Sequence, residues 1–191
     1  MNLPNKLTLL RIILVPVMIA LYALAAPSVT GFPDMLSIAA AAVFILAALT
    51  DIADGKIARR REMITVFGKF IDPIADKLLV VSALILLTEK GLIPGIIVIV
   101  IVAREFIVSG IRLLAASNGS VITSIPSSKL KTIITDIAIV CLMLDNYPFR
   151  LLDIPMTDIL VYISLALTVW SGAELFIRNA KTLKDIIRDA K

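Results

Sequence analysis

Six long apolar segments limit the fold of this chain more than any other feature of its sequence. Each approaches the roughly 20 residues that an α-helix needs to cross a bilayer. Such segments form helices, because lipid offers no hydrogen-bonding partner to the open edge of a strand. Short loops that contain Pro, Gly, Ser or Asn separate them. The segments that we expect to be helical are Leu7–Ala26, Met35–Ala58, Val66–Thr88, Leu92–Ala116, Leu130–Leu144 and Ile159–Ile177.

The composition favours an integral membrane protein. Of the 191 residues, 59% are hydrophobic and only 18% are charged, and the mean hydropathy of +0.99 is far above that of an ordinary globular domain. The sequence shows no internal repeat and no low-complexity linker. We therefore expect one all-α membrane domain over residues 1–191, with six transmembrane helices around a cytoplasm-facing polar cavity.

Histidine is absent from the chain, and Cys141 is its one cysteine. An intramolecular disulfide is therefore excluded, and so is a histidine base or ligand. Any catalysis must depend on carboxylates, amines and hydroxyls.

Positive charge is distributed unequally between the two sides of the predicted helices. With six alternating spans, one side carries both termini and most of the lysines and arginines, whereas the other side holds only Lys90 and Arg150. By the positive-inside rule, both termini face the cytoplasm in a multi-pass protein of the inner (cytoplasmic) cell membrane. A cleaved signal peptide is the weaker interpretation of the first segment, because Arg11 lies inside it and five more segments follow. The bilayer is the expected surrounding, and no nucleic-acid partner is expected.

Four aspartates lie at the predicted cytoplasmic end of the second and third segments. Asp51 and Asp54 are spaced i, i+3, and Asp72 and Asp76 are spaced i, i+4, so each pair shares one helix face. The intervening basic turn can bring the two faces together. Carboxylates this close cannot all ionise unaided, and hard divalent cations prefer carboxylate oxygens. One or two Mg²⁺ or Mn²⁺ ions would relieve the repulsion, and we expect two.

Residues beside the aspartates indicate a phosphate-bearing ligand. Gly55 directly follows Asp54, and Gly68 lies one helical turn before Asp72, so a bulky ligand can approach both backbones. Arg59 adds a cation suited to bidentate contact with phosphate. Together with metal ions, these residues predict a phosphoryl-transfer site.

The segment from Asp51 to Asp76 reads D-x2-D-G-x2-A-R-x8-G-x3-D-x3-D, and this pattern resembles the signature of the CDP-alcohol phosphatidyltransferase family at all eight fixed positions. The resemblance implies a six-helix membrane fold, usually a homodimer. It also implies that an alcohol attacks the phosphate next to the diacylglycerol of CDP-diacylglycerol and that CMP leaves.

The resemblance also implies roles for single residues. Asp51, Asp54 and Asp72 resemble the main metal ligands, and Asp76 resembles the residue that contacts the metal and accepts the alcohol's proton as the catalytic base. The positions that resemble the CDP-diacylglycerol site are Gly55, Ala58, Arg59, Gly68, Asn5 and Thr8.

Cations in the fourth and fifth segments indicate which alcohol accepts the phosphatidyl group. Arg104 and Arg112 lie close to one helix face, and Lys129 and Lys131 open the next helix on the same membrane side. These four residues suit an acceptor that carries its own phosphate, for which we expect sn-glycerol 3-phosphate. The segments Asn2–Arg11 and Ala103–Arg112 resemble those of bacterial family members that use this acceptor.

Two alternatives remain open at this point. Another acceptor within the family, such as inositol phosphate or serine, would use the same donor site. Asp136 stands where relatives commonly have Gln, which weakens the assignment of the acceptor slightly. An ion-coupled transporter would also contain intramembrane aspartates, but transporters usually have broken helices or inverted repeats, and none is evident here.

Overall fold

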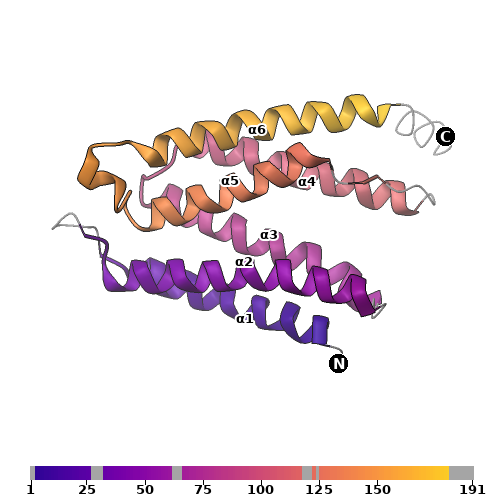
Figure 1. Cartoon of the computed structure of the whole chain (residues 1–191), viewed down its shortest axis with the longest axis horizontal. Coiled ribbons are helices and arrows are strands. Elements are labelled where there is room, and N and C mark those ends of the chain that lie inside the picture. The colour runs from indigo at the N-terminus through magenta and orange to yellow at the C-terminus, as the bar shows by residue number, and fades with distance from the viewer. Residues whose placement is uncertain (1–2, 27–31, 62–65, 118–121, 124, 181–191) are drawn as a thin grey trace.

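The computed structural model describes the backbone of residues 3–26, 32–61, 66–117, 122–123 and 125–180, and the side chains of residues 8–26, 32–50, 74–75, 77–117, 122–123 and 125–180 (Figure 1). These residues form six α-helices and one short 3₁₀-helix. The helices are α1 (Leu3–Leu24), α2 (Met35–Arg61), α3 (Val66–Glu89), α4 (Gly95–Ser117), α5 (Pro126–Met143), η1 (Phe149–Leu152) and α6 (Met156–Arg178).

The all-α class and all six predicted helices are confirmed, with boundaries that differ by a few residues. The α2 helix continues to Arg61, three residues beyond the predicted end, because the basic residues after Ala58 are good helix formers. The α5 helix begins four residues early at Pro126, since proline is well suited to the first turn of a helix. A turn at Gly91, with φ of +72°, separates α3 from α4.

One helix of the described residues, α6, is both long enough and apolar enough to span a membrane by length and composition. Charged residues explain why two of the other helices, α4 and α5, do not meet this criterion. The α4 helix carries Arg104, Glu105 and Arg112 within its apolar sequence, and α5 carries two lysines and Asp136. Shorter apolar stretches are present at Thr8–Leu24 and Met35–Thr50.

The six helices pack in two groups, which are connected by α3 and by a contact between α2 and α5. Helices α1 and α2 pack along each other, and α6 packs on α5 and α4, while α3 contacts α1, α2, α4 and α5 (Figure 1). Small side chains such as Ala40, Ala47 and Ala83 are completely buried and allow close helix packing. The main core also includes Phe44 and Ile139.

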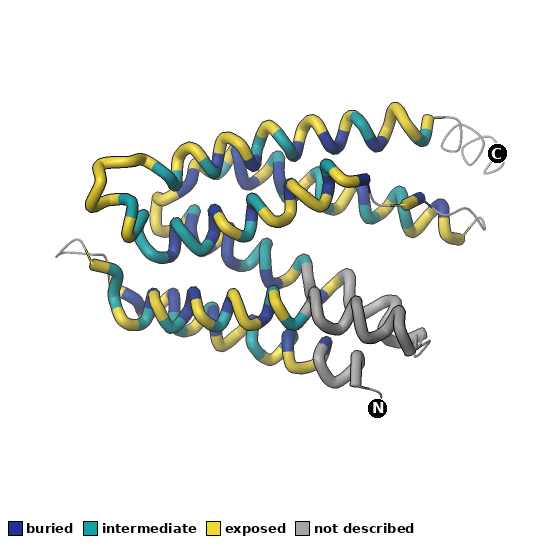
Figure 2. Tube along the Cα trace, in the orientation of Figure 1, coloured by how far each residue is buried: buried dark blue, intermediate teal, exposed yellow. Residues whose placement is uncertain are grey.

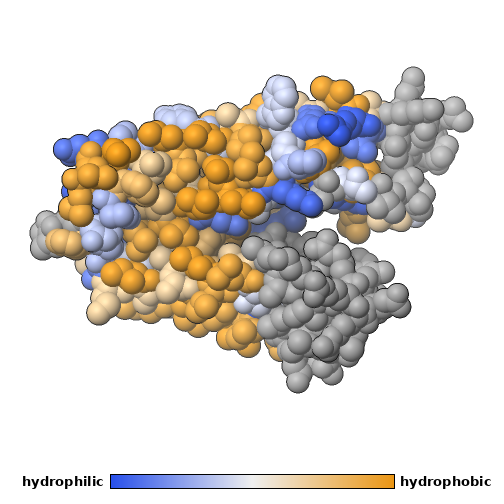
Figure 3. Space-filling view, viewed as in Figure 1, coloured by the Kyte–Doolittle hydropathy of each residue, from blue (hydrophilic) through white to orange (hydrophobic). Residues whose placement is uncertain are grey.

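Large apolar side chains are exposed on all six helices (Figure 2). Examples are Ile13 in α1, Leu46 in α2, Ile99 in α4 and Trp170 in α6. On the face that Figure 3 shows, apolar residues cover most of the coloured surface, with a hydrophilic patch near the centre and further hydrophilic residues towards the ends. This distribution is the one that a bilayer around the helices would stabilise.

Candidate active site

The helical placement of the four aspartates agrees with the prediction. Asp51 and Asp54 lie in the last three turns of α2, and Asp72 and Asp76 lie in the first three turns of α3. Both pairs therefore have the helical spacing that puts their members on one face. Only four residues separate α2 from α3, and these helices are in contact, so the two pairs lie at the same end of the bundle.

The carboxylate groups themselves lie outside the described side chains, and so does the predicted metal site that they form. Among the side chains that the structure does describe, no three carboxylates or thiolates converge. The predicted donor-site residues Asn5, Gly55, Ala58, Arg59 and Gly68 are helical but likewise fall outside the described side chains. Thr8, also predicted for that site, is buried in α1 with 2% exposure.

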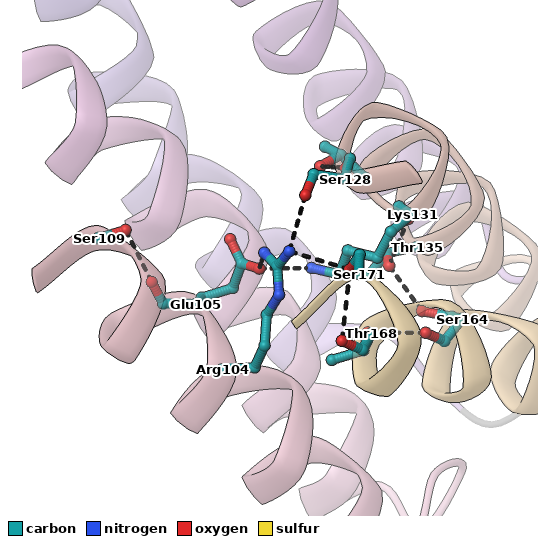
Figure 4. Close-up of polar contacts among 10 residues, drawn as sticks. Arg104, Glu105, Ser109, Ser128, Lys131, Thr135, Ser164, Thr168 and Ser171 are labelled. Atoms are coloured by element: carbon teal, nitrogen blue, oxygen red, sulfur yellow. Dashed lines mark hydrogen bonds and ion pairs between the residues drawn. The ribbon is translucent and has the colours of Figure 1, made fainter. Parts of the chain in front are cut away.

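Arg104 in α4 is held by side chains from three helices (Figure 4). Its Nη1 donates to Oε1 of Glu105 at 2.8 Å, and its Nη2 donates to the hydroxyls of Ser128 in α5 and Ser171 in α6, each at 2.9 Å. Gly172 lies beside this side chain, and a Cβ at that position would make an ordinary contact of 3.5 Å with Cγ of Arg104. The guanidinium is thus fixed in position and 12% exposed.

Glu105 joins Arg104 to Lys131. Nζ of Lys131 donates to the same Oε1 at 2.8 Å, and the lysine side chain is only 3% exposed. One carboxylate therefore lies between the buried Lys131 and the partly buried Arg104. Removing one partner from such a group is costly, because the remaining charges are left without compensation.

Hydroxyl groups continue this network along the contact between α5 and α6. The hydroxyls of Thr135 and Ser164 are 2.6 Å apart, and both side chains are buried. Thr168 donates back to the carbonyl of Ser164 at 2.7 Å, and Ser171 donates to the carbonyl of Thr168 at 3.3 Å. Each of these buried hydroxyls has a hydrogen-bonding partner, which fixes how α6 is rotated against α5.

Three guanidinium nitrogens in α4 are buried without a hydrogen-bond acceptor in the described part of the chain. These are Nε of Arg104 and Nε and Nη2 of Arg112. Eight residues separate the two arginines, which is about 12 Å along the helix. Buried donors of a cation are normally satisfied, so this pair points to a missing anionic partner.

A small cavity of about 30 Å³, lined by charged and apolar side chains, connects this network to α3. Lys77, which directly follows Asp76, lines it together with Glu105, Lys131 and Asp136. The volume accommodates about one water molecule. The network of α4 and α5 therefore reaches the part of α3 that carries the second pair of aspartates.

Of the four predicted acceptor cations, the structure brings Arg104 and Lys131 together through Glu105. Arg112 lies on the same helix as Arg104, two turns nearer its C-terminal end. Lys129 is exposed on a different face of α5, because residues two positions apart in a helix point in nearly opposite directions.

The sequence analysis missed the hydroxyls that hold Arg104, namely those of Ser128 and Ser171. Serine is common in the contacts between membrane helices, so neither residue stands out in the sequence. The recurrence of small polar residues at Ser164, Thr168 and Ser171 in α6 was the available signal, because this spacing places them on one helix face.

Comparison with known proteins defines the class. The model of the CDP-alcohol phosphatidyltransferase family matches residues 1–170. The chain therefore belongs to the CDP-alcohol phosphatidyltransferase family, whose members are embedded in membranes.

Two relatives match over nearly their whole length. A protein of Bacillus subtilis (strain 168), named CDP-diacylglycerol–glycerol-3-phosphate 3-phosphatidyltransferase, is 42% identical over 190 residues, which cover 96% of this chain and 97% of the relative. A protein of Rickettsia bellii (strain RML369-C) with the same name is 37% identical over 179 residues, covering 92% of this chain and 93% of the relative.

Proposed function

We propose that the protein transfers the phosphatidyl group of CDP-diacylglycerol to sn-glycerol 3-phosphate and so produces phosphatidylglycerophosphate and CMP. The full-length similarity to two proteins named for this activity supports the reaction. The structural observation that carries the proposal is the immobilised Arg104, whose Nε faces no acceptor in the described residues although it is buried. A phosphate on the acceptor would satisfy this donor, whereas a neutral alcohol would not.

The carboxylates of Asp51, Asp54, Asp72 and Asp76 form a donor set that fits Mg²⁺ or Mn²⁺, since both ions favour oxygen ligands. Such ions, as a pair, would supply positive charge to the pyrophosphate and to the departing CMP. The helical spacing of both aspartate pairs supports this assignment, and so does the contact between α2 and α3.

Other residues of the chain bind the two substrates. Arg59 pairs with the pyrophosphate, while Asn5, Thr8, Gly55, Ala58 and Gly68 line the site of the cytidine and pyrophosphate. Arg104 and Arg112 bind the phosphate of glycerol 3-phosphate, with Lys131 and Lys129 adding positive charge. Glu105, Ser128 and Ser171 are positioning residues for Arg104.

In the reaction, a hydroxyl oxygen of glycerol 3-phosphate forms a bond to the phosphorus next to the diacylglycerol. The bond from that phosphorus to the oxygen of CMP breaks, and CMP leaves with its electron pair. Asp76 takes the proton of the attacking hydroxyl, because a carboxylate is the one suitable base type in a chain that lacks histidine. The position of Lys77, next to Asp76, on the cavity shared with Glu105 and Lys131 supports an attack from the α4–α5 side.

The membrane arrangement follows from the same site. Both described ends of the chain, the end of α2 and the beginning of α3 lie at one end of the bundle (Figure 1). Because the cations also concentrate there, we place this end at the cytoplasmic face, where CDP-diacylglycerol and glycerol 3-phosphate meet. We also propose that the protein forms a homodimer, and this part of the proposal rests on the family resemblance alone.

A panel of acceptors tests the activity. Purified protein in detergent, supplied with CDP-diacylglycerol and Mg²⁺, should release CMP with glycerol 3-phosphate. It should release little with glycerol, serine or inositol phosphate. Faster release with serine or inositol phosphate would assign the chain to another member of the family.

Substitution of the arginines tests the acceptor site. Arg104→Ala and Arg112→Ala should raise KM for glycerol 3-phosphate by roughly 10- to 100-fold, lower kcat, or both, since each removes a charge-assisted contact. Arg104→Lys should fail to restore the parent KM, because lysine lacks the planar fork that bonds Ser128 and Ser171. Arg178→Ala, which changes an exposed arginine of α6, is the control and should leave KM unchanged. Weakened binding of CDP-diacylglycerol with an unchanged KM for the acceptor would place the acceptor site elsewhere.

A further inference from the structure

A second polar cavity lies at the other end of the bundle, away from the aspartates. Its volume is about 410 Å³, which is within the range of small-molecule sites. Its walls come from the end of α1, the beginning of α2, the turn after α3 and the end of α5 with the loop that follows. Hydrophilic residues gather at this end of the molecule (Figure 3).

Lys90 and Tyr22 form one wall of this cavity. Nζ of Lys90 lies 4.8 Å from the centre of the Tyr22 ring and donates to the carbonyl of Ala25 at 2.7 Å. An ammonium has three donor positions, so two of them remain for a ligand. Tyr22 is 2% exposed and lines the cavity, and a tyrosine hydroxyl can donate a hydrogen bond to a phosphate oxygen.

The cavity also collects the two cations that the charge distribution places on this side of the membrane. Lys90 and Arg150 are the lysine and arginine expected there, and both line the same cavity. Cations are disfavoured on this side by the positive-inside rule, so their convergence calls for a local reason.

The carboxylates of the cavity are already engaged, and they balance the cations in number. Asp145 pairs with Arg150 at 2.5 Å, and Oδ2 of Asp34 accepts the N–H of Leu36 at 3.1 Å. The cavity therefore suits a ligand with one phosphate and further polar groups better than a polyanion. Leu92, Leu142 and Met143 supply an apolar part of its lining, which suits a ligand that is itself amphipathic.

We propose that this cavity binds the phosphate-bearing headgroup of a glycerophospholipid from the leaflet opposite the active site. The Lys90 ammonium and the Tyr22 hydroxyl contact the phosphate, and Leu92, Leu142 and Met143 contact the glycerol and the first methylenes. The location rests on the membrane placement given with the proposed function. A lipid bound there would connect the α1–α2 pair to α5 and so stabilise the contact between the two helix groups.

Lipid retention and thermal stability of the purified full-length protein test this proposal. Delipidated protein in detergent is titrated with phosphatidylethanolamine, phosphatidylglycerol, diacylglycerol or inorganic phosphate. Binding is followed by native mass spectrometry and by the temperature of unfolding. Both phospholipids should bind and raise the unfolding temperature, while diacylglycerol and inorganic phosphate should not.

Two conservative variants locate the bound lipid. Lys90→Met removes the charge but keeps the length, and Tyr22→Phe removes only the hydroxyl. Each should weaken phospholipid binding, by about 10-fold or more for Lys90→Met and by less for Tyr22→Phe. Lys90→Arg should retain most of the binding. Glu89→Gln, a change at the exposed neighbouring residue that does not line the cavity, is the matched control.

Release of CMP with saturating substrates should be unchanged in all of these variants, which separates this site from the active site. Equal binding of diacylglycerol, stabilisation by inorganic phosphate alone, or full retention of phospholipid in both Lys90→Met and Tyr22→Phe would overturn the proposal. Binding does not depend on turnover. A failed transferase assay with normal lipid retention would therefore count against the proposed function and leave this cavity as a lipid site.

Discussion

Glu105→Gln is the most informative single change, because it removes the one negative charge that Arg104 and the buried Lys131 share while keeping the shape of the side chain. Arg104 and Lys131 each contact Oε1 at 2.8 Å, so their contacting nitrogens are no more than twice that distance apart. At an effective dielectric constant of about 20, two unit charges at this separation repel by about 3 kcal/mol. Loss of the carboxylate from a buried group of this kind costs about 3–5 kcal/mol in stability. The temperature of unfolding should then fall by at least about 6 °C, at roughly 2 °C for each kcal/mol in a chain of this size.

The same change should weaken the binding of glycerol 3-phosphate, because Arg104 loses the partner that fixes its Nη1. Thermal unfolding in detergent and the KM for glycerol 3-phosphate are measured in parallel, and KM is expected to rise about 10-fold or more. Arg178→Gln is the control. It removes an ion pair with Glu174 in which the arginine is 62% exposed, and such pairs contribute at most about 1 kcal/mol. A Glu105→Gln protein with the parent's unfolding temperature and acceptor KM would refute the role given to this carboxylate.

Three further predictions concern the carboxylates and α6. Removal of divalent ions with a chelator should abolish CMP release, and Mg²⁺ or Mn²⁺ should restore it; undiminished turnover in excess chelator would contradict the metal assignment. Single Asp→Asn changes should leave folding intact in gel filtration but lower the rate by at least about 10²-fold, and parent-like rates would exclude the proposed chemistry. These changes are made at Asp51, Asp54, Asp72 and Asp76. Gly172→Ala should be tolerated, because the added Cβ would meet Arg104 at an ordinary 3.5 Å, whereas Gly172→Leu should displace Arg104 and raise the acceptor KM. Equal kinetics in the two glycine variants would show that Arg104 does not depend on this space.

The sequence was sufficient to predict the six helices, because runs of about 20 apolar residues permit few alternatives. Their ends were less accurate. The extension of α2 to Arg61 is favoured by the helix propensity of Lys and Arg, which a hydropathy profile does not register. The beginning of α5 at Pro126 lies in a stretch with polar residues, where hydropathy is equally uninformative.

The candidate site was predictable where charges stand in an apolar segment and unpredictable where the groups are small and common. Arg104 was identified because a guanidinium in an apolar helix requires a partner. In the structure this partner is Glu105, whose Oε1 lies 2.8 Å from Nη1 of Arg104. Ser128 and Ser171 could not be assigned, since they lie 24 and 67 residues from Arg104 and meet it only through helix packing.

The division of the bundle into two groups suggests why donor and acceptor functions are separable. The aspartates lie on α2 and α3, whereas Arg104 is fixed by side chains of α4, α5 and α6. Helix α3 contacts members of both groups, and Lys77 brings it to the cavity beside Glu105. Changes in the hydroxyl groups of α6 therefore act on the position of Arg104 without reaching the carboxylates directly. Their effect should appear in KM for glycerol 3-phosphate and not in the binding of CDP-diacylglycerol, because the residues proposed for the donor site belong to α1, α2 and α3.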